Sequence, residues 1–545
     1  MKKLPIGIEN FKELIDKGYY YVDKTMWIKD VLSEKLVSYT RPRRFGKTLN
    51  MSMLYYFFSN KEKDNAYLFD NLEIYKEQEI MKHQNQYPVI FISLKDMIES
   101  SFEAQMDSYA SLVSDIVKKN KELFDSTQID DADKDILRNL KYRKGQMIDL
   151  KESLYRISQC LQQHYYQKVI ILIDEYDVPL HAAYKNGYYD EMVNFLKTVF
   201  SSALKTNDAL EKGILTGCLR ISKESIFTGL NNFKTYSILD IKSSCYFGFT
   251  YQDIEALLKF YNFERYIQEV KDWYDGYLFG DTDIFNPWSS LMYVDRKLQK
   301  ESLKPISFWA NTSGNDIVIN YIKDGNQTLH DEFELLMQGK TLVKEIKPEL
   351  TYRDMNNINN IYSFLLMTGY LKIYKEIKTN EVYELVIPNK EVYKIYDQSF
   401  MDYFNEIKHQ YVNEFIQLLD DEEVEKSQSM LNDILDRSIS YYDNYESFYH
   451  GFLLGLFQDL DVSSNKEAGD GRFDIEILPR RLDGTVIIIE CKHSATLDEL
   501  MSDSQKAAKQ MKDKRYLLNP KYQKYKKSVG YGISFFKKQC IITKA

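Results

Sequence analysis

The sequence has few of the residues that mark fibrous, disordered or disulfide-stabilised proteins. Its 545 residues include only 22 glycines and 10 prolines, which excludes collagen-like, linker-dominated and disordered chains. The five cysteines are scattered without close pairs, and the seven histidines form no HExxH or Cys/His cluster, so we expect neither a disulfide framework nor a structural zinc site. These absences predict a packed globular protein in a reducing compartment, the cytoplasm.

Long apolar runs are also missing. The N-terminus MKKLPIGIENF lacks the apolar stretch of a secretion signal, and the longest runs, such as Val169–Ile173, are far shorter than the ~18 residues of a membrane span. We therefore expect a protein that is neither secreted nor embedded in a membrane. A net charge of −9 argues against a generally basic surface, so any site for nucleic acid must be local.

Residues 36–216 alternate short apolar runs with longer segments of helical period, which is the pattern of βα units in a parallel sheet. Leu49, Met53 and Phe57 recur at helical spacing and predict an apolar stripe that faces this sheet. The four expected strands are Leu36–Tyr39, Val89–Ile92, Val169–Ile173 and Ile214–Leu215.

Two further regions follow this sheet. Residues from about 250 to 440 have mainly helical patterns with aromatic-rich connections. From Gly469 the period changes to two, which predicts a β-hairpin of Phe473–Leu478 and Thr485–Ile489 and then a helix near 501–517. At roughly 100–200 residues per domain the length allows about three or four domains. We place the domains at 1–245, 246–425 and 426–545.

A candidate phosphate-binding loop lies where the first expected strand turns into a helix. Gly46-Lys47-Thr48 reproduces the second half of the GxxxxGK[ST] pattern, whereas arginine stands at position 41 in place of the first glycine. Gly46 lets backbone N–H groups approach a phosphate, Lys47 can reach its oxygens, and Thr48 can ligate Mg²⁺. A GKT tripeptide by itself is often accidental. The residues expected to bind the nucleotide here are Arg43, Arg44, Phe45, Gly46, Lys47 and Thr48.

The apolar run Val169–Ile173 ends in two acids, as a Walker B strand does. We expect Asp174 to hold Mg²⁺ and Glu175 to polarise the attacking water, although an aspartate after a strand is also a good helix N-cap. Thr216, after a later strand, is a candidate sensor of the γ-phosphate. Arg220 is either an arginine finger or an exposed arginine at the start of a helix.

These residues resemble those of the AAA-ATPase-like proteins of bacteria and archaea, whose hallmark is a loop of the form RPRRFGK[ST]. The arginine at position 41 is thus the variant of that family. The resemblance implies ATP binding on a P-loop core, followed by a C-terminal nuclease-like domain. It covers nearly the whole chain and extends over Leu4-Pro-Ile-Gly7, Tyr21-Val-Asp-Lys-Thr25, Asp174-Glu175-Tyr-Asp177, Thr216-Gly217, Trp273-Tyr-Asp-Gly-Tyr277, Asn286-Pro-Trp288, Thr312-Ser-Gly314 and Ile387-Pro-Asn-Lys-Glu-Val392.

The C-terminal hairpin carries a second candidate site. Asp474 opens one strand, and Glu490 and Lys492 share a face of the next because strands repeat every two residues. Two acids that hold Mg²⁺ or Mn²⁺, beside a lysine, suit phosphodiester cleavage and match the D…(E)xK pattern of the PD-(D/E)XK nucleases. An ExK on a strand is also common as a surface charge pair. Glu446 is a further candidate acid, and Gln510 with Tyr516 resembles the downstream helix of resolvase-like members.

Positive charge is concentrated in this last region. Residues 471–545 contain 16 Lys and Arg against 8 Asp and Glu. The charge is densest in Lys512–Lys527, where Tyr516, Tyr522 and Tyr525 alternate with basic residues. Such a segment predicts a surface that follows phosphates and stacks bases, with a solvated basic helix face as the alternative.

The expected fold class is therefore α/β: a P-loop NTPase parallel sheet, a mainly helical middle region and a C-terminal α/β domain of PD-(D/E)XK nuclease type. The leading hypothesis is an ATPase whose turnover controls a Mg²⁺-dependent endo- or exonuclease acting on nucleic acid, DNA more than RNA. The alternative is a nucleotide-switched signalling or scaffold ATPase that uses an inactive nuclease fold to bind nucleic acid. The sequence leaves the oligomeric state open.

Overall fold

The computed structural model forms two compact units, which we describe separately. The N-terminal unit comprises Met1–Asn315 with Leu335–Ile395, and the C-terminal unit Asp316–Glu334 with Tyr396–Ala545. The structure describes residues 1–205, 207–219, 233–309, 327–379, 381–438, 449, 452–454, 456–457, 461–464, 467–468, 471–472, 474–479 and 481–545. None of the helices in these ranges has both the length and the hydropathy that crossing a bilayer requires.

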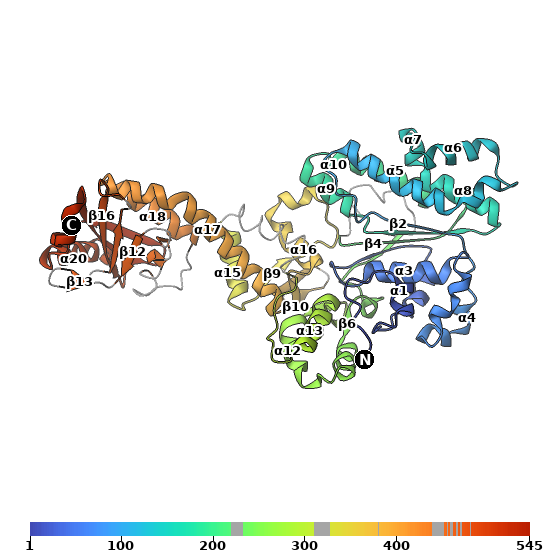
Figure 1. The fold of residues 1–545 in the computed structure, drawn as a ribbon, viewed down its shortest axis with the longest axis horizontal. Coiled ribbons are helices and arrows are strands. Elements are labelled where there is room, and N and C mark those ends of the chain that lie inside the picture. Colours follow the sequence, from blue (N-terminus) through green and yellow to red (C-terminus); the bar gives the residue numbers. More distant parts are fainter. Residues whose placement is uncertain are drawn as a thin grey trace. The chain divides into compact units, whose positions relative to one another are not determined.

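The N-terminal unit is built on a five-stranded parallel sheet in the order β2-β3-β4-β1-β5. The four strands expected from the sequence are confirmed, each within a few residues. Figure 1 shows α1 and α3 on one side of the sheet and the helices from α5 to α10 on the other. The strands are β1 (Leu36–Thr40), β2 (Val89–Ser93), β3 (Val169–Asp174), β4 (Leu210–Gly217) and β5 (Phe233–Tyr236), and the helices are α1 (Phe11–Asp16), α2 (Trp27–Leu32), α3 (Lys47–Phe58), α4 (Gln78–Met81), α5 (Phe102–Lys119), α6 (Asp131–Lys141), α7 (Met147–Lys151), α8 (Ser153–Tyr165), α9 (Val178–Asn186) and α10 (Tyr189–Leu204).

Helix α3 differs from the amphipathic helix that the sequence predicts. Met53 and Phe57 are buried as expected, but Met51 and Ser52 on another side of the helix are buried too. The cause is the N-terminal segment, because the backbone N–H of Phe11 donates to Ser52 Oγ at 3.0 Å. The helix that follows the candidate phosphate loop is thus enclosed rather than half exposed.

The middle region is mainly helical, as expected, and also contains two small antiparallel sheets, in the orders β6-β8-β7 and β10-β11-β9. Its apolar core includes Ile254, Val270 and Tyr274. The helices are α11 (Tyr251–Phe260), α12 (Ile267–Tyr274), α13 (Pro287–Gln299), α15 (Gln327–Met337), α16 (Ile358–Thr368) and α17 (Lys390–Asp420), and the strands are β6 (Phe249–Thr250), β7 (Tyr277–Phe279), β8 (Thr282–Phe285), β9 (Leu342–Glu345), β10 (Lys372–Lys378) and β11 (Val382–Val386).

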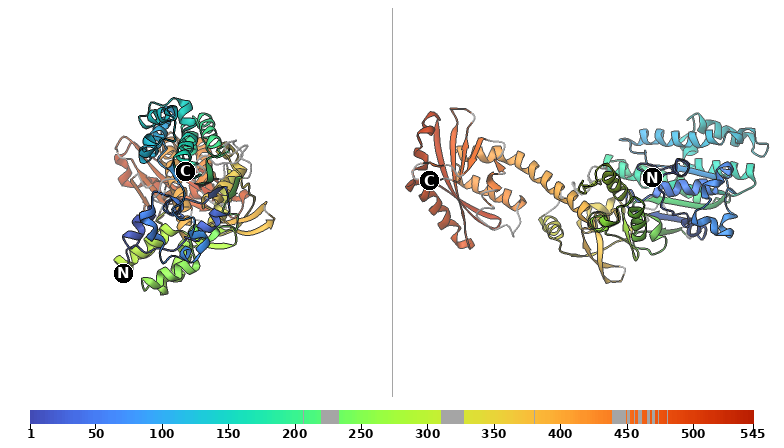
Figure 2. Two further views of the ribbon diagram at one scale, coloured as in Figure 1. Left: turned by 90° about the vertical axis from the view of Figure 1, so that its right-hand side faces the viewer. Right: turned by 60° about the horizontal axis from the view of Figure 1, so that its bottom comes forward.

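The C-terminal unit has a mixed sheet in the order β12-β15-β16-β17-β18. The expected hairpin and helix are confirmed as β15, β16 and α20, and α20 connects the parallel pair β16 and β17. Figure 2 shows this sheet with α20 on one side and α17 and α18 on the other. The elements are α18 (Val424–Ser438), β12 (Asp461–Ser464), β13 (Glu467–Ala468), β14 (Gly471–Arg472), β15 (Ile475–Leu478), β16 (Thr485–His493), α20 (Leu500–Asp513), β17 (Lys527–Phe536) and β18 (Gln539–Lys544).

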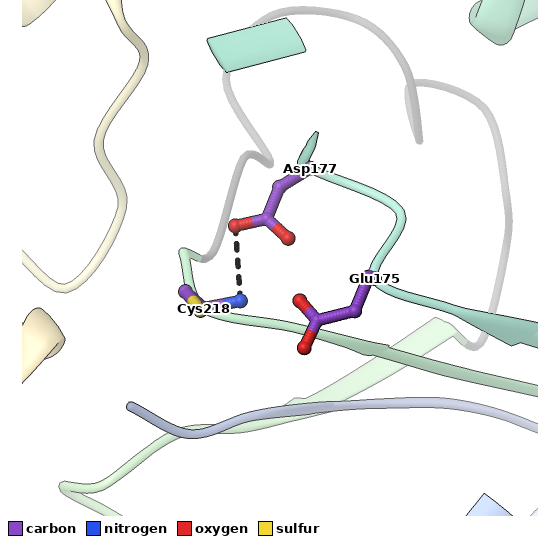
Figure 3. A group of neighbouring side chains, drawn as sticks. All are labelled: Glu175, Asp177 and Cys218. Atoms are coloured by element: carbon purple, nitrogen blue, oxygen red, sulfur yellow. Dashed lines mark hydrogen bonds between the residues drawn. The ribbon is translucent and has the colours of Figure 1, made fainter. Parts of the chain in front are cut away.

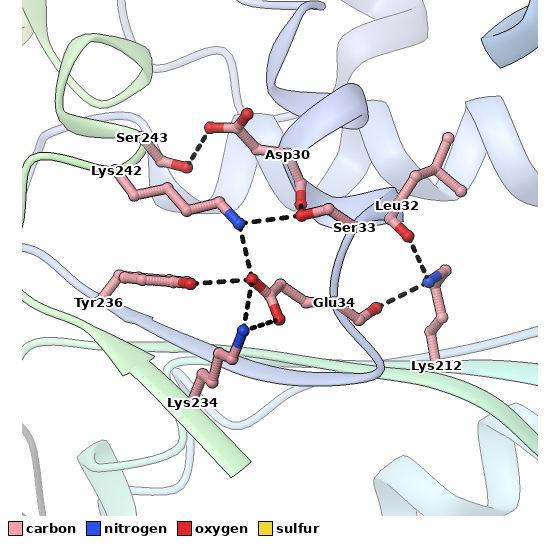
Figure 4. Close-up of polar contacts among 9 residues, drawn as sticks. All are labelled: Asp30, Leu32, Ser33, Glu34, Lys212, Lys234, Tyr236, Lys242 and Ser243. Carbon is pink, nitrogen blue, oxygen red and sulfur yellow. Dashed lines mark hydrogen bonds and ion pairs between the residues drawn. The ribbon is translucent and has the colours of Figure 1, made fainter. Parts of the chain in front are cut away.

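A buried carboxylate joins three segments of the N-terminal unit (Figure 4). Glu34, which is 7% exposed, accepts hydrogen bonds from Lys242 at 2.6 Å and from the hydroxyl of Tyr236 at 2.8 Å, and it pairs with Lys234 at 2.9 Å. Nearby, the ammonium of Lys212 on β4 donates to the carbonyl oxygen of Glu34 at 2.7 Å. These contacts fix the start of β1 against β4, β5 and the segment that follows β5.

We expect Glu34→Gln to lower the free energy of unfolding by about 2 kcal/mol at neutral pH, because two lysines lose their anionic partner. Burial by itself would raise the pKa of Glu34, but its hydrogen bonds to Lys242, Lys234 and Tyr236 lower it from 4.5 to about 2. The contribution of the carboxylate is therefore complete above about pH 4.5 and is lost as the pH falls toward 2. Urea denaturation of both proteins across this range should show their stabilities converging in acid.

The matched control is Glu13→Gln, because Glu13 pairs with Lys17 at 2.7 Å on the exposed face of α1. Its effect should stay below about 0.5 kcal/mol. An equal loss in both variants would show that the Glu34 cluster carries no special stability.

Candidate functional sites

The strand order brings the sequence-predicted residues of the N-terminal unit to one edge of the sheet. Strand β4 lies between β1 and β3, and all three are parallel, so their carboxyl ends meet. Thr216 near the end of β4 is thus placed between the loop after β1 and Asp174 at the end of β3. Ligand sites in open parallel sheets commonly lie at such an edge.

The loop between β1 and α3 places Lys47 among polar backbone atoms. Gly46 has φ 82°, a left-handed conformation that glycine adopts without strain, and it begins α3. The Lys47 ammonium donates to the carbonyl oxygens of Arg41 and Pro42, both at 3.1 Å, and lies 3.2 Å from Glu175 Oε1. Burial works against its charge, but Cys218, Glu175 and further acids nearby outweigh burial and raise the Lys47 pKa.

Asp174 connects three elements through its carboxylate. Thr48 Oγ1 donates to Asp174 Oδ2 at 2.8 Å, and Thr216 Oγ1 donates to Asp174 Oδ1 at 2.6 Å. Asp174 is fully buried, and this burial, followed by the charge of Glu175, raises its pKa. The hydroxyl and carboxylate oxygens are hard donors, the type that Mg²⁺ prefers, and they converge at the N-terminus of α3.

Glu175 forms an acidic group with Asp177 and Cys218, whose roles could not be assigned from the sequence (Figure 3). Glu175, Asp177 and Cys218 bring their ligand atoms within 4.8 Å of one another. Asp177 Oδ2 accepts the backbone N–H of Cys218 at 2.9 Å, and burial, then the charge of Glu175, raises the Asp177 pKa to about 6. Lys47 Nζ lies 3.5 Å from Cys218 Sγ, so the ammonium already supplies this group with a cation. The signal in the sequence was the spacing Asp174-Glu175-Tyr-Asp177.

The other side chains of the loop point elsewhere. Arg41 is fully buried between Phe247 and Phe279, with its guanidinium carbon 5.1 and 5.4 Å from the two ring centres. Phe45 is fully buried, and the Arg44 guanidinium stacks on Trp288 at 4.2 Å. Burial works against the charge of Arg43, but interactions with Cys218, Asp177 and other groups nearby raise its pKa. Of the predicted nucleotide ligands, Gly46, Lys47, Thr48, Asp174 and Thr216 come together with Glu175, and Phe45 and Arg44 do not. Arg220 lies outside the described residues.

In the C-terminal unit the hairpin register places Asp474 opposite Glu490. Ile475 on β15 pairs with Ile489 on β16, so the preceding residue faces the following one, and Asp474 Oδ2 accepts the backbone N–H of Cys491 at 2.7 Å. Directly opposed residues have Cβ atoms about 5 Å apart. Burial raises the pKa of Tyr516; its hydrogen bond with Gln510 opposes this effect, and the charges of Glu490 and Asp474 add to it.

Helix α20 completes this site. The side-chain amide of Gln510 donates to Glu490 Oε1, and Tyr516 in turn contacts Gln510. Lys492 follows Glu490 on the same face and helps to keep the pKa of Asp503 low, after the larger effect of Lys506. The helix can approach so closely because Gly532 faces it: a Cβ there would lie 2.4 Å from the backbone of Ser504 and Ala508.

The basic segment Lys512–Lys527 differs from the base-stacking surface expected from the sequence, because two of its three tyrosines are buried. Tyr516 and Tyr522 are only 1% and 4% exposed, so these rings cannot stack on bases. They fill the core between the sheet and α20, and the Tyr522 hydroxyl donates to the buried Glu476 at 2.5 Å. Lys521 pairs with that same carboxylate. The exposed basic residues of the segment are Lys512, Lys514, Arg515, Lys521, Lys524 and Lys526. Glu446 lies outside the described residues.

Comparison with known proteins agrees with both halves of this description. Residues 5–227 match the AAA-ATPase-like family model, described as a predicted AAA-ATPase, and residues 444–545 match a model of the PD-(D/E)XK nuclease superfamily. A curated protein of Azotobacter chroococcum mcd 1, described as an uncharacterized protein in the vnfD 5′ region, is 25% identical over 402 residues. That alignment covers 72% of this chain and 68% of the relative. The family resemblance seen in the sequence is thus confirmed.

We expect Arg41→Gly, which restores the usual first glycine of a phosphate loop, to destabilise the N-terminal unit by about 3 kcal/mol. The arginine fills space between two aromatic rings and donates to the carbonyl oxygen of Tyr236 on β5 at 2.9 Å. Burial disfavours the charge of Arg41 and lowers its pKa to about 10, so its packing and hydrogen bonds are what favour the fold. Arg41→Met, which keeps the volume, should cost less than half as much in urea denaturation. A neutral Arg41→Gly would contradict this role.

Proposed function

We propose that this chain, which joins an AAA-ATPase-like domain to a domain of the PD-(D/E)XK nuclease superfamily, is an ATPase whose nucleotide turnover controls metal-dependent action on nucleic acid. The observation that carries the proposal is the pair of hydrogen bonds from Thr48 and Thr216 to the two oxygens of Asp174. They join the start of α3 to the ends of two parallel strands. Such a constellation suits a nucleotide whose phosphates lie at the N-terminus of α3.

The residues present fit ATP and Mg²⁺. Thr48 and Asp174 would hold the ion, which when bound neutralises phosphate charge. Lys47 contacts two carbonyl oxygens, Glu175 and the Cys218 sulfur here, and it would turn to the β- and γ-phosphate oxygens. Glu175, released from Lys47 by the phosphates, would accept a proton from the attacking water, with Thr216 beside the γ-phosphate.

The C-terminal site fits a divalent ion in the same sense. Asp474 and Glu490 oppose each other on adjacent strands, and carboxylate oxygens are ligands for both Mg²⁺ and Mn²⁺. Bound there, the ion would polarise a phosphodiester and a water. Gln510 orients Glu490, and Lys492 supplies positive charge on the same face. The exposed lysines between 512 and 526 would hold the nucleic-acid backbone through charge alone, and we favour DNA over RNA as the substrate.

We expect Lys47→Ala to weaken ATP binding by about 10- to 100-fold, because the phosphates lose a charged hydrogen-bond donor while the backbone loop remains. Isothermal titration calorimetry with ATP and Mg²⁺ measures the change, and thermal unfolding of the same samples checks the fold. The control is Lys168→Ala, an exposed lysine at the amino end of β3. Unchanged affinity in Lys47→Ala would contradict the site assignment.

Glu175→Gln should separate binding from chemistry. The amide keeps the shape of the side chain but cannot accept the proton of water, so we expect ATP affinity to persist and hydrolysis to fall by about 10²- to 10³-fold. Phosphate release measures the rate. Hydrolysis at the wild-type rate would place the base on another residue.

Asp474→Asn and Glu490→Gln should each remove Mn²⁺ binding by the C-terminal site and any metal-dependent cleavage of DNA, because one carboxylate cannot hold the ion alone. Calorimetry with Mn²⁺ and gel assays with single- and double-stranded DNA, with and without ATP, provide the measurements. Asp483→Asn, in the exposed turn of the hairpin, is the control. Wild-type protein that binds DNA but neither binds Mn²⁺ at this site nor cleaves would favour the scaffold alternative.

A further inference from the structure

The loop that follows β1 packs against the middle region, and it does so with side chains that a glycine-rich loop lacks. Phe45 lies 5.0 Å from the ring of Tyr277 and 5.2 Å from that of Phe279, both on β7. A Cβ added at Gly369, just after α16, would lie 3.3 Å from Pro42 Cβ. With Arg41 between Phe247 and Phe279, the loop has three separate anchors in the segment 247–369.

The same region holds the beginning of α17. Gly276, with φ 101°, lies so close to the carbonyl oxygen of Pro388 that a Cβ would come within 2.2 Å of it. Asn389, the residue before α17, donates to the carbonyl oxygen of Asp275 at 2.7 Å and accepts the backbone N–H of Val392 at 2.9 Å. The Trp273–Tyr277 and Ile387–Val392 motifs, whose roles could not be assigned from the sequence, are therefore packed against each other beside the loop.

Arg44 connects the loop to α17 through two residues. Its guanidinium stacks on Trp288 at 4.2 Å, and the neighbouring Ser289 donates its hydroxyl to Glu391 Oε1 at 2.9 Å. Trp288 and Ser289 belong to the first turn of α13, and Glu391 to the first turn of α17. The chain of contacts thus passes from the loop through α13 to α17.

Glu391 is unusual for a carboxylate. It is fully buried, and its Oε1 also accepts the backbone N–H groups of Phe308 at 2.8 Å and Trp309 at 3.0 Å. Its Oε2 is buried and accepts no hydrogen bond from the described residues. Burial, reduced by the hydrogen bonds from Ser289, Phe308 and Trp309 and by the charge of Arg44, raises its pKa to about 7. The charge and hydrogen bonds of a carboxylate buried in this way depend strongly on the position of the nearby cation.

Helix α17 belongs to both compact units. It runs over 31 residues from Lys390 to Asp420, and the boundary between the units falls within it, after Ile395. In the C-terminal unit, Phe415 and Leu419 of this helix pack in the core beneath the sheet that carries Asp474 and Glu490. The secondary structure is therefore continuous from the first turn of α17 into the C-terminal unit.

From these contacts we infer that Arg44, Trp288 and Glu391 transmit the occupancy of the phosphate loop to helix α17, and so regulate the C-terminal domain. The inference rests on the proposed function, because it requires ATP at the loop. Trp288 and Glu391 are positioning residues here, and they need not touch the nucleotide.

The physical cause is competition for the cations of the loop. Lys47 is held by the carbonyl oxygens of Arg41 and Pro42, and incoming phosphates take over this ammonium. Phosphate also attracts the Arg44 guanidinium more strongly than an aromatic face does, because charge-assisted hydrogen bonds exceed cation–π stacking. When Arg44 leaves Trp288, the first turns of α13 and α17 lose their common contact with the loop.

The test measures amide hydrogen exchange of the full chain with Mg²⁺ alone and with Mg²⁺ and a non-hydrolysable ATP analogue. We expect the analogue to change exchange in residues 387–396 of the wild type by at least about twofold. Trp288→Leu and Glu391→Gln should bind the analogue within about threefold of the wild-type affinity yet lose the response in 387–396. Trp288→Phe, which keeps an aromatic face, should retain the response. Trp273→Leu, which removes a half-buried tryptophan and leaves the Arg44–Trp288 stack in place, is the matched control.

Three results would overturn the inference. One is analogue binding by the wild type without any change in 387–396, and another is a full response in both Trp288→Leu and Glu391→Gln. A response lost equally in Trp273→Leu would show that general loosening, and not this path, is responsible. Failure of the wild type to bind the analogue at all would instead remove the proposed function itself, and the inference with it.

Discussion

The buried ammonium of Lys47 is the interaction on which the N-terminal site depends. It lies in an enclosed space with the carboxylates of Glu175 and Asp177 and with two backbone carbonyl oxygens, and a buried group of anions is stable only with a cation close by. This arrangement holds the site closed and charged at the same time. Its cation is exchangeable, because phosphate oxygens are better partners for an ammonium than carbonyl oxygens are. In the proposed function, a bound nucleotide would therefore replace contacts that Lys47 makes within the protein.

The loop around Lys47 explains why arginine, proline and phenylalanine stand where glycine-rich loops have small residues. Arg41 and Phe45 turn away from the sheet edge and enter the core that the loop shares with the middle region, leaving the backbone and Lys47 for the ligand. A glycine-rich loop can move without disturbing its neighbours, whereas a change in a loop with packed side chains also displaces the residues that those side chains contact. Up to Asn315 and from Leu335 to Ile395, the middle region belongs to the same compact unit as the sheet, in agreement with this dependence.

The C-terminal site depends on the close approach of helix α20 to strand β17, whereas the N-terminal site depends on the charge of Lys47. Gly532 allows the backbone of α20 to lie directly on β17, and this brings Gln510 to Glu490 across the sheet. Register alone places Asp474 opposite Glu490. The neighbouring Glu476, on the same face of β15, is committed to Lys521, Tyr522 and Ser463, and those hydrogen bonds outweigh its burial and lower its pKa. Glu476 thus holds the fold together, whereas Asp474 and Glu490 oppose each other across the hairpin.

The sequence by itself determined the elements and the motifs of both sites. Unbroken apolar runs of four or five residues located β2 and β3, and a change to a two-residue period located the hairpin of β15 and β16. Glycine at position 46 and the acids after β3 are local signals as well. Asp474, Glu490 and Lys492 could be assigned to one face because the strand period is short and strict.

Only the tertiary structure decided which of these residues meet and which are buried. That β4 separates β1 from β3, and so inserts Thr216 beside Asp174, is a matter of strand order, which local periodicity does not carry. Tyr516 and Tyr522 look in the sequence like exposed stacking rings among lysines, yet a helix and a sheet close over them. Asp177 and Glu391 belong to motifs that are visible in the sequence, but their surroundings could not be predicted, because the groups that enclose an acid come from distant segments. Side-chain type sets what chemistry a residue can do, and packing against distant segments sets whether its surroundings permit it.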